Sequence, residues 1–265
     1  MNRNTGSFVA AILTIASVPA LGQWLNIPTK GIPRTKDGKP DLSAATPRKP
    51  NFKPDLSGVW QGDKNGKYLG NLAADFKPGE LPIQPWAEVV SKERMTGAHA
   101  SEIPDANCIP AGVPQSYTFL HPFKIIQQPD LMVILYEAYS VFRQIFLDGR
   151  ELPKDPNPTW LGYSIGRWEG DGLVVDTTGF NGKKWLDNTA GHPSTDVLHF
   201  TERFRRRDFG HVDLQLTIDD PKAYTRPWSV NLPLLLLADT DLMEYVCNEN
   251  EKDLKHMVGK VGQPK

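Results

Sequence analysis

The sequence predicts an all-β protein, an antiparallel up-and-down barrel of about ten strands with one short helix and an extended N-terminal arm. From Phe123 onward, runs of β-branched and aromatic residues alternate with turn residues at intervals of about ten. Nearly all connections between these runs are short, which favours neighbouring antiparallel strands. A barrel then removes the exposed edges that an open sheet would leave. The segment 179–196 is the exception, a long connection.

Composition excludes several classes of protein. The chain has 265 residues, and its 30 Lys and Arg against 31 Asp and Glu give a net charge of −1. This balance argues against a nucleic-acid partner, which normally requires a strongly basic domain. The hydrophobic fraction of 39% is too high for a disordered chain. Two Cys are too few for a Cys-rich zinc site, and no nucleotide-binding motif is present, so we expect no cofactor. A metal site at His192 and His199, with Asp196 and Glu202 nearby, is a weaker alternative, because this spacing matches no established ligand pattern.

The first residues predict an export signal. Arg3 gives a short positive start, residues 8–20 form an apolar run, and Ala20-Leu21-Gly22 supplies small residues for cleavage before Gln23. No later segment is long enough to span a bilayer. We therefore expect a secreted or periplasmic protein that does not insert into the membrane after cleavage. The predicted organisation is a signal peptide at 1–22, a Pro/Lys-rich arm or linker at 23–57 and a single barrel domain at 58–265.

The predicted arm has an unusual composition. Residues 27–57 hold six Pro, and seven Lys or Arg against three Asp. Pro at this density favours extended, solvated chain. The pentapeptide Lys39-Pro-Asp-Leu-Ser43 recurs as Lys53-Pro-Asp-Leu-Ser57. Either the arm lies on the domain, or it docks to another protein of the cell envelope.

Each element has a local reason in the sequence. Pro85 at a first helical position, followed by apolar residues at helical spacing before Gly97, predicts one helix. Asp148-Gly149 and Asp171-Gly172 are hairpin dipeptides. Strands are expected at 58–61, 123–127, 131–137, 140–147, 160–168, 172–178, 197–206, 211–219, 227–236 and 241–248.

Export also bears on the two cysteines. In an oxidising compartment Cys108 and Cys247 are expected to form a disulfide across a very long loop. The alternative is two free thiols, one of them reactive. No motif that would activate a thiolate is visible, which favours the disulfide.

Two resemblances to known families follow from short phrases. Gly58-Val59-Trp60 resembles the Gly-x-Trp signature of lipocalins and related calycins, where the Trp closes one end of the barrel. Other phrases resemble a widespread family of secreted bacterial proteins without an established activity. They are Lys53-Pro-Asp-Leu-Ser-Gly-Val-Trp60, Gln84-Pro-Trp-Ala-Glu88, Cys108-Ile-Pro-Ala-Gly-Val-Pro114, Ser164-Ile-Gly-Arg-Trp-Glu-Gly-Asp171, Thr201-Glu-Arg-Phe-Arg-Arg206 and Glu244-Tyr-Val-Cys-Asn-Glu-Asn250.

The second resemblance covers nearly all of the chain after the signal. It implies export and one shared fold, and it transfers no catalytic residue. The family pattern has a basic residue after Gly112-Val113-Pro114 and a second His after His192-Pro193. This chain has Gln115 and Ser194 at those places, so the resemblance carries over no role that needs a charged or imidazole group there.

The predicted strand 197–206 places a carboxylate in the barrel. Period-two alternation puts Leu198, Phe200, Glu202 and Phe204 on the inner side. Burial disfavours the charged form of a carboxyl group, so Glu202 is a candidate general acid or base. The structural alternative is a buried ion pair with Arg143 or Arg167. In the predicted last strand, Glu244 has the inward position and is a second candidate interior carboxylate.

The long connection 179–196 is the loop in which we most expect functional residues. Trp185, Asp187 and His192 lie within eight residues of one another. Loops at a barrel mouth commonly carry the site. His192 is the candidate for proton transfer, with Asp187 to orient it. The alternative is an ordered lid with Trp185 as a plug.

These residues lead to three hypotheses. The first is a cofactor-independent acid–base enzyme of lyase, hydratase, isomerase or hydrolase type, acting on a largely hydrophobic, ring-containing small molecule. In it Glu202 and His192 move protons, and Arg167 or Arg143 steadies negative charge. The second is a lipocalin-like carrier of a small apolar or aromatic molecule, and the third is an interaction module that uses the arm. Candidate ligand contacts are Arg143, Tyr163, Trp185, Trp228 and Glu244.

Overall fold

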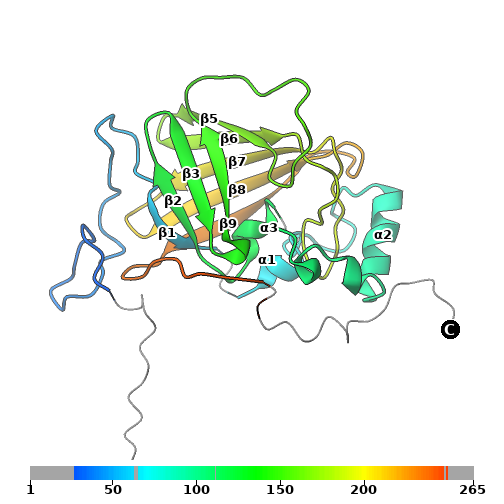
Figure 1. Ribbon diagram of the computed structural model, residues 1–265, viewed down its shortest axis with the longest axis horizontal. Coiled ribbons are helices and arrows are strands. Elements are labelled where there is room, and N and C mark those ends of the chain that lie inside the picture. The colour runs from blue at the N-terminus through cyan, green and yellow to red at the C-terminus, as the bar shows by residue number, and fades with distance from the viewer. Residues whose placement is uncertain (1–26, 63–64, 111, 248, 250–265) are drawn as a thin grey trace, which may run out of the picture.

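The computed structural model describes residues 27–62, 65–110, 112–247 and 249. The predicted signal peptide therefore lies outside the described residues. Nine strands close into a barrel in chain order (Figure 1), which confirms the all-β barrel. They are β1 (Gly58–Gln61), β2 (Phe123–Gln127), β3 (Leu131–Tyr136), β4 (Val141–Phe146), β5 (Tyr163–Glu169), β6 (Gly172–Thr178), β7 (His199–Arg206), β8 (His211–Asp219) and β9 (Trp228–Leu236).

The barrel is mostly, but not entirely, antiparallel. β4 and β5 run parallel and share only two residue pairs, Ile145 with Ser164 and Phe146 with Ile165. The expectation of a purely antiparallel meander is wrong at this point. Parallel neighbours need a connection that returns along the sheet, and residues 147–162 provide it outside the barrel. This short pairing leaves a seam between β4 and β5.

The predicted tenth strand at 241–248 is wrong. The described residues 241–247 have no strand structure, and Glu244 is exposed. β9 already pairs with β1, Trp60 with Leu236 and Gln61 with Leu235, and this closes the barrel. A closed barrel has no free edge for another strand. The inward position expected for Glu244 is therefore also wrong.

Short helices cover the barrel end at which β1 finishes. The predicted helix is confirmed as α2 (Pro85–Met95), with Pro85 at its first position. The segment expected as a loop between α2 and β2 also contains regular turns. They are α3 (Gln115–Thr118), η1 (Ala100–Glu102) and η2 (Asp105–Asn107), while α1 (Lys67–Gly70) precedes α2 and η3 (Ala138–Ser140) joins β3 to β4. No helix in the described part of the chain is long and apolar enough to cross a membrane.

The barrel interior is filled with side chains. The predicted facing of β7 is confirmed, because Phe200, Glu202 and Phe204 are all buried. Tyr117 of α3 enters the barrel and packs edge-on against Phe123, with ring centroids 5.1 Å apart. Trp60 is buried at the other end, where its Nε1 donates to the Leu56 carbonyl at 2.9 Å. The core therefore continues from one barrel mouth to the other.

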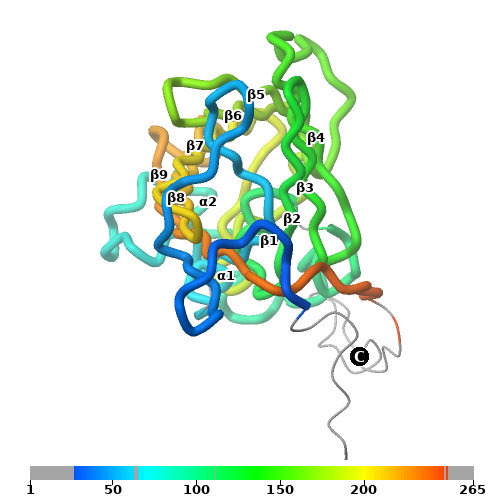
Figure 2. The backbone as a smooth tube through the Cα atoms, turned by 90° about the vertical axis from the view of Figure 1, so that its left-hand side faces the viewer, coloured from blue at the N-terminus to red at the C-terminus, as the bar shows by residue number. Residues whose placement is uncertain are grey.

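Each copy of the repeated pentapeptide begins at the closing side of a short hairpin, so the arm contains the same hairpin twice. The first hairpin is closed by a bridge between Arg34 and Pro40, and the second by a bridge between Arg48 and Pro54. Arg34 then pairs with Asp239 at 2.5 Å, and Arg48 with Asp171 at 2.7 Å. Figure 2 shows the arm, in dark blue, running along the outside of the barrel near β1 and β8. The arm thus lies on the domain, as one of the two alternatives predicted.

Candidate functional site

The centre of the barrel holds an ion pair between β4 and β7. Arg143 Nη1 donates to Glu202 Oε1 at 2.8 Å, and Nη2 donates to Oε2 at 2.5 Å. Nε donates to Ser164 at 3.0 Å, while the remaining Nη protons reach Tyr117 at 3.1 Å and Thr177 at 2.7 Å. A guanidinium has five N–H donors, so every donor of Arg143 is bonded. This confirms the structural alternative for Glu202, an ion pair with Arg143.

The carboxylate oxygens of Glu202 also have hydrogen-bond partners. Besides the two bonds from Arg143, it accepts a hydrogen bond from the Tyr117 hydroxyl at 2.6 Å. Burial, and next the charge of Glu202, raises the pKa of Tyr117 well above its usual value, so the phenol remains a donor. Glu202 is 0% exposed and Arg143 is 2% exposed. A proton-transfer role for Glu202 stays a prediction. These contacts favour a structural role, in which Glu202 stabilises the barrel.

Arg167 does not belong to this centre. On β5, Ser164 points inward and Arg167 has the opposite parity, so its side chain lies on the outer face. There it pairs with Asp176, and with Glu169 at 3.2 Å. The expectation that Arg167 supplies an inward charge is therefore wrong.

The predicted pair in the 179–196 connection does meet. His192 Nδ1 lies 2.5 Å from Asp187 Oδ2, and the other carboxylate oxygen accepts the His192 backbone N–H at 3.1 Å. Asp187 also accepts the Leu72 N–H at 2.8 Å, so it ties this connection to the segment after α1. An imidazole held through Nδ1 keeps Nε2 for exchange of a proton. In the described residues, no hydrogen bond or ion pair links this pair to Glu202.

The two tryptophans proposed for ligand stacking are covered. Trp185 is buried, and the Arg94 guanidinium of α2 lies 4.0 Å from its ring centroid. Burial lowers the pKa of Arg94 to about 10. Trp228 is buried between Phe76 and Tyr224, with ring centroids 5.7 and 5.3 Å away. The burial of Trp185 agrees with the alternative interpretation of the 179–196 connection, in which the connection is an ordered lid and Trp185 is its plug.

A pocket opens at the seam between β4 and β5. Its volume is about 460 Å³. Apolar and aromatic side chains form most of its wall: Val141, Phe142, Phe146, Trp160, Leu161 and Tyr163. Arg143 and Ser164 line it from the barrel side. The structure thus brings two predicted ligand contacts, Tyr163 and Arg143, to one pocket, which we call the seam pocket.

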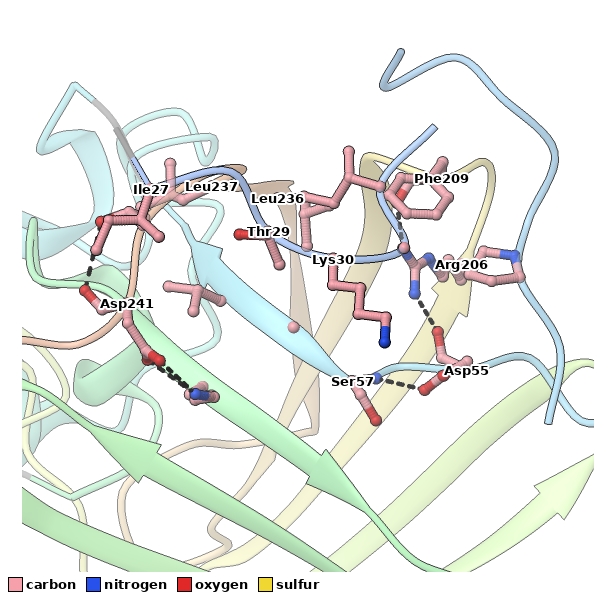
Figure 3. A pocket seen from close by; sticks show the side chains of 17 residues that line it. Ile27, Thr29, Lys30, Asp55, Ser57, Arg206, Phe209, Leu236, Leu237 and Asp241 are labelled. Atoms are coloured by element: carbon pink, nitrogen blue, oxygen red, sulfur yellow. Dashed lines mark hydrogen bonds and ion pairs between the residues drawn. The ribbon is translucent and has the colours of Figure 1, made fainter. Parts of the chain in front are cut away.

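A second pocket of about 520 Å³ lies beneath the arm (Figure 3). Residues 27–32 cross over β1 and the end of β9 to form it. Several of its polar groups pair with one another: Asp241 pairs with Lys124 at 2.8 Å, and Asp55 accepts the Ser57 N–H at 2.8 Å. This pocket is the gap between the arm and the barrel wall where the arm packs on the barrel.

The structure decides the state of the two cysteines. The disulfide between Cys108 and Cys247 is confirmed. In the part of the chain that the structure describes, no three His, Cys, Asp or Glu side chains form a group suited to a metal ion.

Sequence reasoning missed three members of the central network. Ser164 and Thr177 are buried on β5 and β6, so polar residues at every second position of these two strands were the available signal. Tyr117 gave no such signal, because it comes from a segment without a recognisable period.

The fold and its centre define a class: a closed, mostly antiparallel β-barrel with a filled core and a buried polar network at its centre. No protein-family model matches this chain, and no curated protein matches it in sequence.

Proposed function

We propose that this protein is an exported carrier that holds a small apolar or aromatic molecule in the seam pocket. The observation that supports the proposal is the composition of that pocket, an aromatic wall with a charge-neutral floor. Its volume of about 460 Å³ lies within the range of roughly 300–1,000 Å³ typical of small-molecule sites. The export signal expected from the sequence and the disulfide support the compartment.

The residues that line the seam pocket from the barrel side, Arg143 and Ser164, favour binding over catalysis. Arg143 lines the pocket, but Glu202 neutralises its charge and all five of its N–H groups are bonded. An anionic ligand would have to displace Glu202 from a fully buried pair, which is costly. An uncharged ring has no such requirement. The pocket therefore suits a neutral, flat molecule that packs on Phe142 and Tyr163.

The test uses an uncharged aromatic probe, N-phenyl-1-naphthylamine, whose fluorescence rises in an apolar site. Phe142 is 61% exposed at the pocket, so Phe142→Ala removes a wall and leaves the core intact. We expect the dissociation constant to rise about five- to ten-fold, from an aromatic contact of about 1 kcal/mol.

Phe52 gives a matched control. It is 80% exposed, lies on the arm and does not line the seam pocket, so Phe52→Ala should bind the probe as wild type does. Equal affinities for all three proteins, or a loss in Phe52→Ala alone, would remove the seam pocket as the site.

A second function, acid–base catalysis, is favoured by one observation, the Asp187–His192 contact of 2.5 Å. Incubation of the purified protein with a metabolite extract of the source cells, read by untargeted mass spectrometry, separates the two functions. A compound enriched on the protein without products supports the carrier. Products formed by wild type and His199→Gln, but not by His192→Gln, would support an enzyme and overturn the carrier proposal.

A further inference from the structure

A third pocket, at the end of the barrel covered by the short helices, is built mainly from aromatic rings. Its volume is about 190 Å³. The rings of Phe119, His121, Tyr139 and Tyr245 surround it, and the carboxyl group of Asp105 also lines it. We call it the aromatic box. It shares no lining residue with the seam pocket, so it does not depend on the proposed carrier function.

The rings meet at steep angles, as the walls of a box do. Tyr139 and Tyr245 have centroids 5.7 Å apart at 75°, and Phe119 lies 6.0 Å from Tyr139 at 53°. His121 closes a further side, 4.8 Å from Tyr245 at 61°. At these angles the rings are not stacked face to face, and all four of them line the same pocket. The face of an aromatic ring is its negative part and attracts cations.

Two polar groups in the box have unmet needs. Asp105 accepts a hydrogen bond from Asn188 at 3.3 Å, and among the described residues no Lys or Arg pairs with it. The loss of water around Asp105 raises the pKa of its carboxyl group, as expected for a carboxylate without a full counter-charge. The hydroxyl of Tyr139 is buried and has no hydrogen-bond partner in the described chain. An apolar ligand would leave the Asp105 carboxylate without a counter-charge, an anion would be repelled by it, and an alkylated ammonium group would supply the missing positive charge.

The backbone is held in an unusual conformation to place these rings. Tyr139 and Ser140 both have positive φ values, 65° and 49°, which side-chain-bearing residues adopt at a cost. The Ser140 hydroxyl then donates to the Tyr245 carbonyl at 3.0 Å. The disulfide joins Cys108, three residues after Asp105, to Cys247, two residues after Tyr245. One covalent bond therefore links the carboxylate side of the box to one of its aromatic walls.

We propose that the aromatic box binds a small organic cation, an alkylated ammonium group, by cation–π contact with Tyr139 and Tyr245 and charge pairing with Asp105. The volume of about 190 Å³ equals that of about six water molecules, which suits a compact head group. Aromatic cages of this kind are the usual means of recognising quaternary ammonium groups.

Isothermal titration calorimetry with choline chloride tests the proposal on the full-length mature protein. The neutral analogue 3,3-dimethylbutan-1-ol has the same shape without the charge. We expect choline to bind and the neutral analogue to bind at least about ten-fold more weakly. Tyr245→Leu should weaken choline binding about ten-fold, while Tyr245→Phe, which keeps the ring, should stay within about two-fold of wild type. Asp105→Asn should weaken it about five-fold or more.

Tyr163→Leu is the matched control, because it makes the same change in the seam pocket and should leave choline binding unchanged. Far-UV circular dichroism checks that each variant keeps the barrel. Absence of choline binding to wild type, equal binding of the neutral analogue, or wild-type affinity in Tyr245→Leu would each overturn the proposal. None of these results bears on the seam pocket, whose probe and variants are different.

Discussion

Arg143 and Glu202 face each other across the centre of the barrel, joined by two hydrogen bonds of 2.8 and 2.5 Å. One residue comes from β4 and the other from β7, so the pair connects opposite parts of the barrel wall. Because both side chains are buried, neither charge can be hydrated if its partner is lost.

Glu202→Gln should therefore destabilise the fold. It leaves the Arg143 charge buried without a counter-charge, and we expect a loss of about 3–5 kcal/mol in the free energy of unfolding. Urea denaturation measures it. The double variant Arg143→Met/Glu202→Leu removes both charges and should recover much of the loss. A Glu202→Gln protein as stable as wild type, but without activity, would instead restore the catalytic role.

Lys184 provides a pH-dependent test. Its side chain is buried, with Nζ donating to the Val113 carbonyl and lying 3.5 Å from the Phe180 ring centroid. Burial lowers the pKa of Lys184 well below its usual value, and nearby Arg143 lowers it further. Between that lowered pKa and about 10.4, the unfolded chain binds more protons, so the stability of wild type rises with pH.

Lys184→Met lacks this titration. The difference in unfolding free energy between wild type and Lys184→Met should grow with pH in that window, at up to about 1.4 kcal/mol per pH unit. Urea denaturation at several pH values between 7 and 10 measures the slope. Parallel curves for the two proteins would show that Lys184 titrates normally.

The outer face of the barrel should respond to pH in a different range. Hydrogen bonding to Asp176 raises the pKa of His199, and the same contact is the main cause of the lowered pKa of Asp176. The His199 contribution is complete below about pH 6.5 and is lost as pH rises through the raised pKa. The Asp176 contribution is complete above about pH 3.9 and is lost as pH falls through the lowered pKa.

His199→Gln should therefore cost most near pH 5 and least above pH 8. The side chain of His199 is 42% exposed, so we expect an effect below about 1 kcal/mol. Thermal unfolding across this pH range measures it, with His211→Gln as a comparison at another half-buried His–Asp contact. A cost that does not change with pH would argue against the titration.

The disulfide should contribute strongly to stability. Cys108 and Cys247 are separated by 139 residues, and the chain-entropy model gives about 5 kcal/mol for a loop of this length. The Cys108→Ser/Cys247→Ser variant should lose a stabilisation of this order in urea denaturation. Reduction of wild type should reproduce the loss, and reduction of the variant should change nothing.

The first hairpin of the arm depends on a close approach at Gly210. A Cβ at this position would lie 2.4 Å from Leu42 Cβ, and the Gly210 N–H donates to the Leu42 carbonyl at 2.8 Å. Gly210→Ala should displace this hairpin, so trypsin should cut faster after Lys36, which Asp37 follows. Gly172→Ala is the control, because its Cβ would find only ordinary contacts. Equal cleavage rates in the two variants would show that the hairpin tolerates the displacement.

Much of the fold could be predicted because strand signals are local. Period-two alternation correctly predicted that Phe200, Glu202 and Phe204 point into the barrel. Successive side chains of a strand point to opposite faces, so one inward residue of β7 determines which of the others also point inward. The parallel pairing of β4 and β5 could not be predicted, because the return of residues 147–162 outside the barrel leaves no local pattern. The false strand at 241–248 has the same origin: closure by β1 and β9 is a property of the whole sheet.

The candidate sites were predicted less well than the fold. Sequence pattern found Arg143, Glu202, Asp187 and His192, which are polar residues in unusual places. It missed Tyr139 and Tyr245, because aromatic residues normally indicate core and only the fold brings these two rings together.

The duplicated hairpin makes the arm a bivalent attachment. Arg34 holds the chain after β9 and Arg48 holds the turn between β5 and β6, so each hairpin has its own contact on the barrel. When one hairpin dissociates, the other hairpin remains bound and keeps the first at a high effective concentration near its own contact site. Rebinding of the dissociated hairpin is then intramolecular. The arm then leaves the barrel only if the contacts of both hairpins, including the Gly210–Leu42 hydrogen bond, break together, although each exposed ion pair is weak by itself.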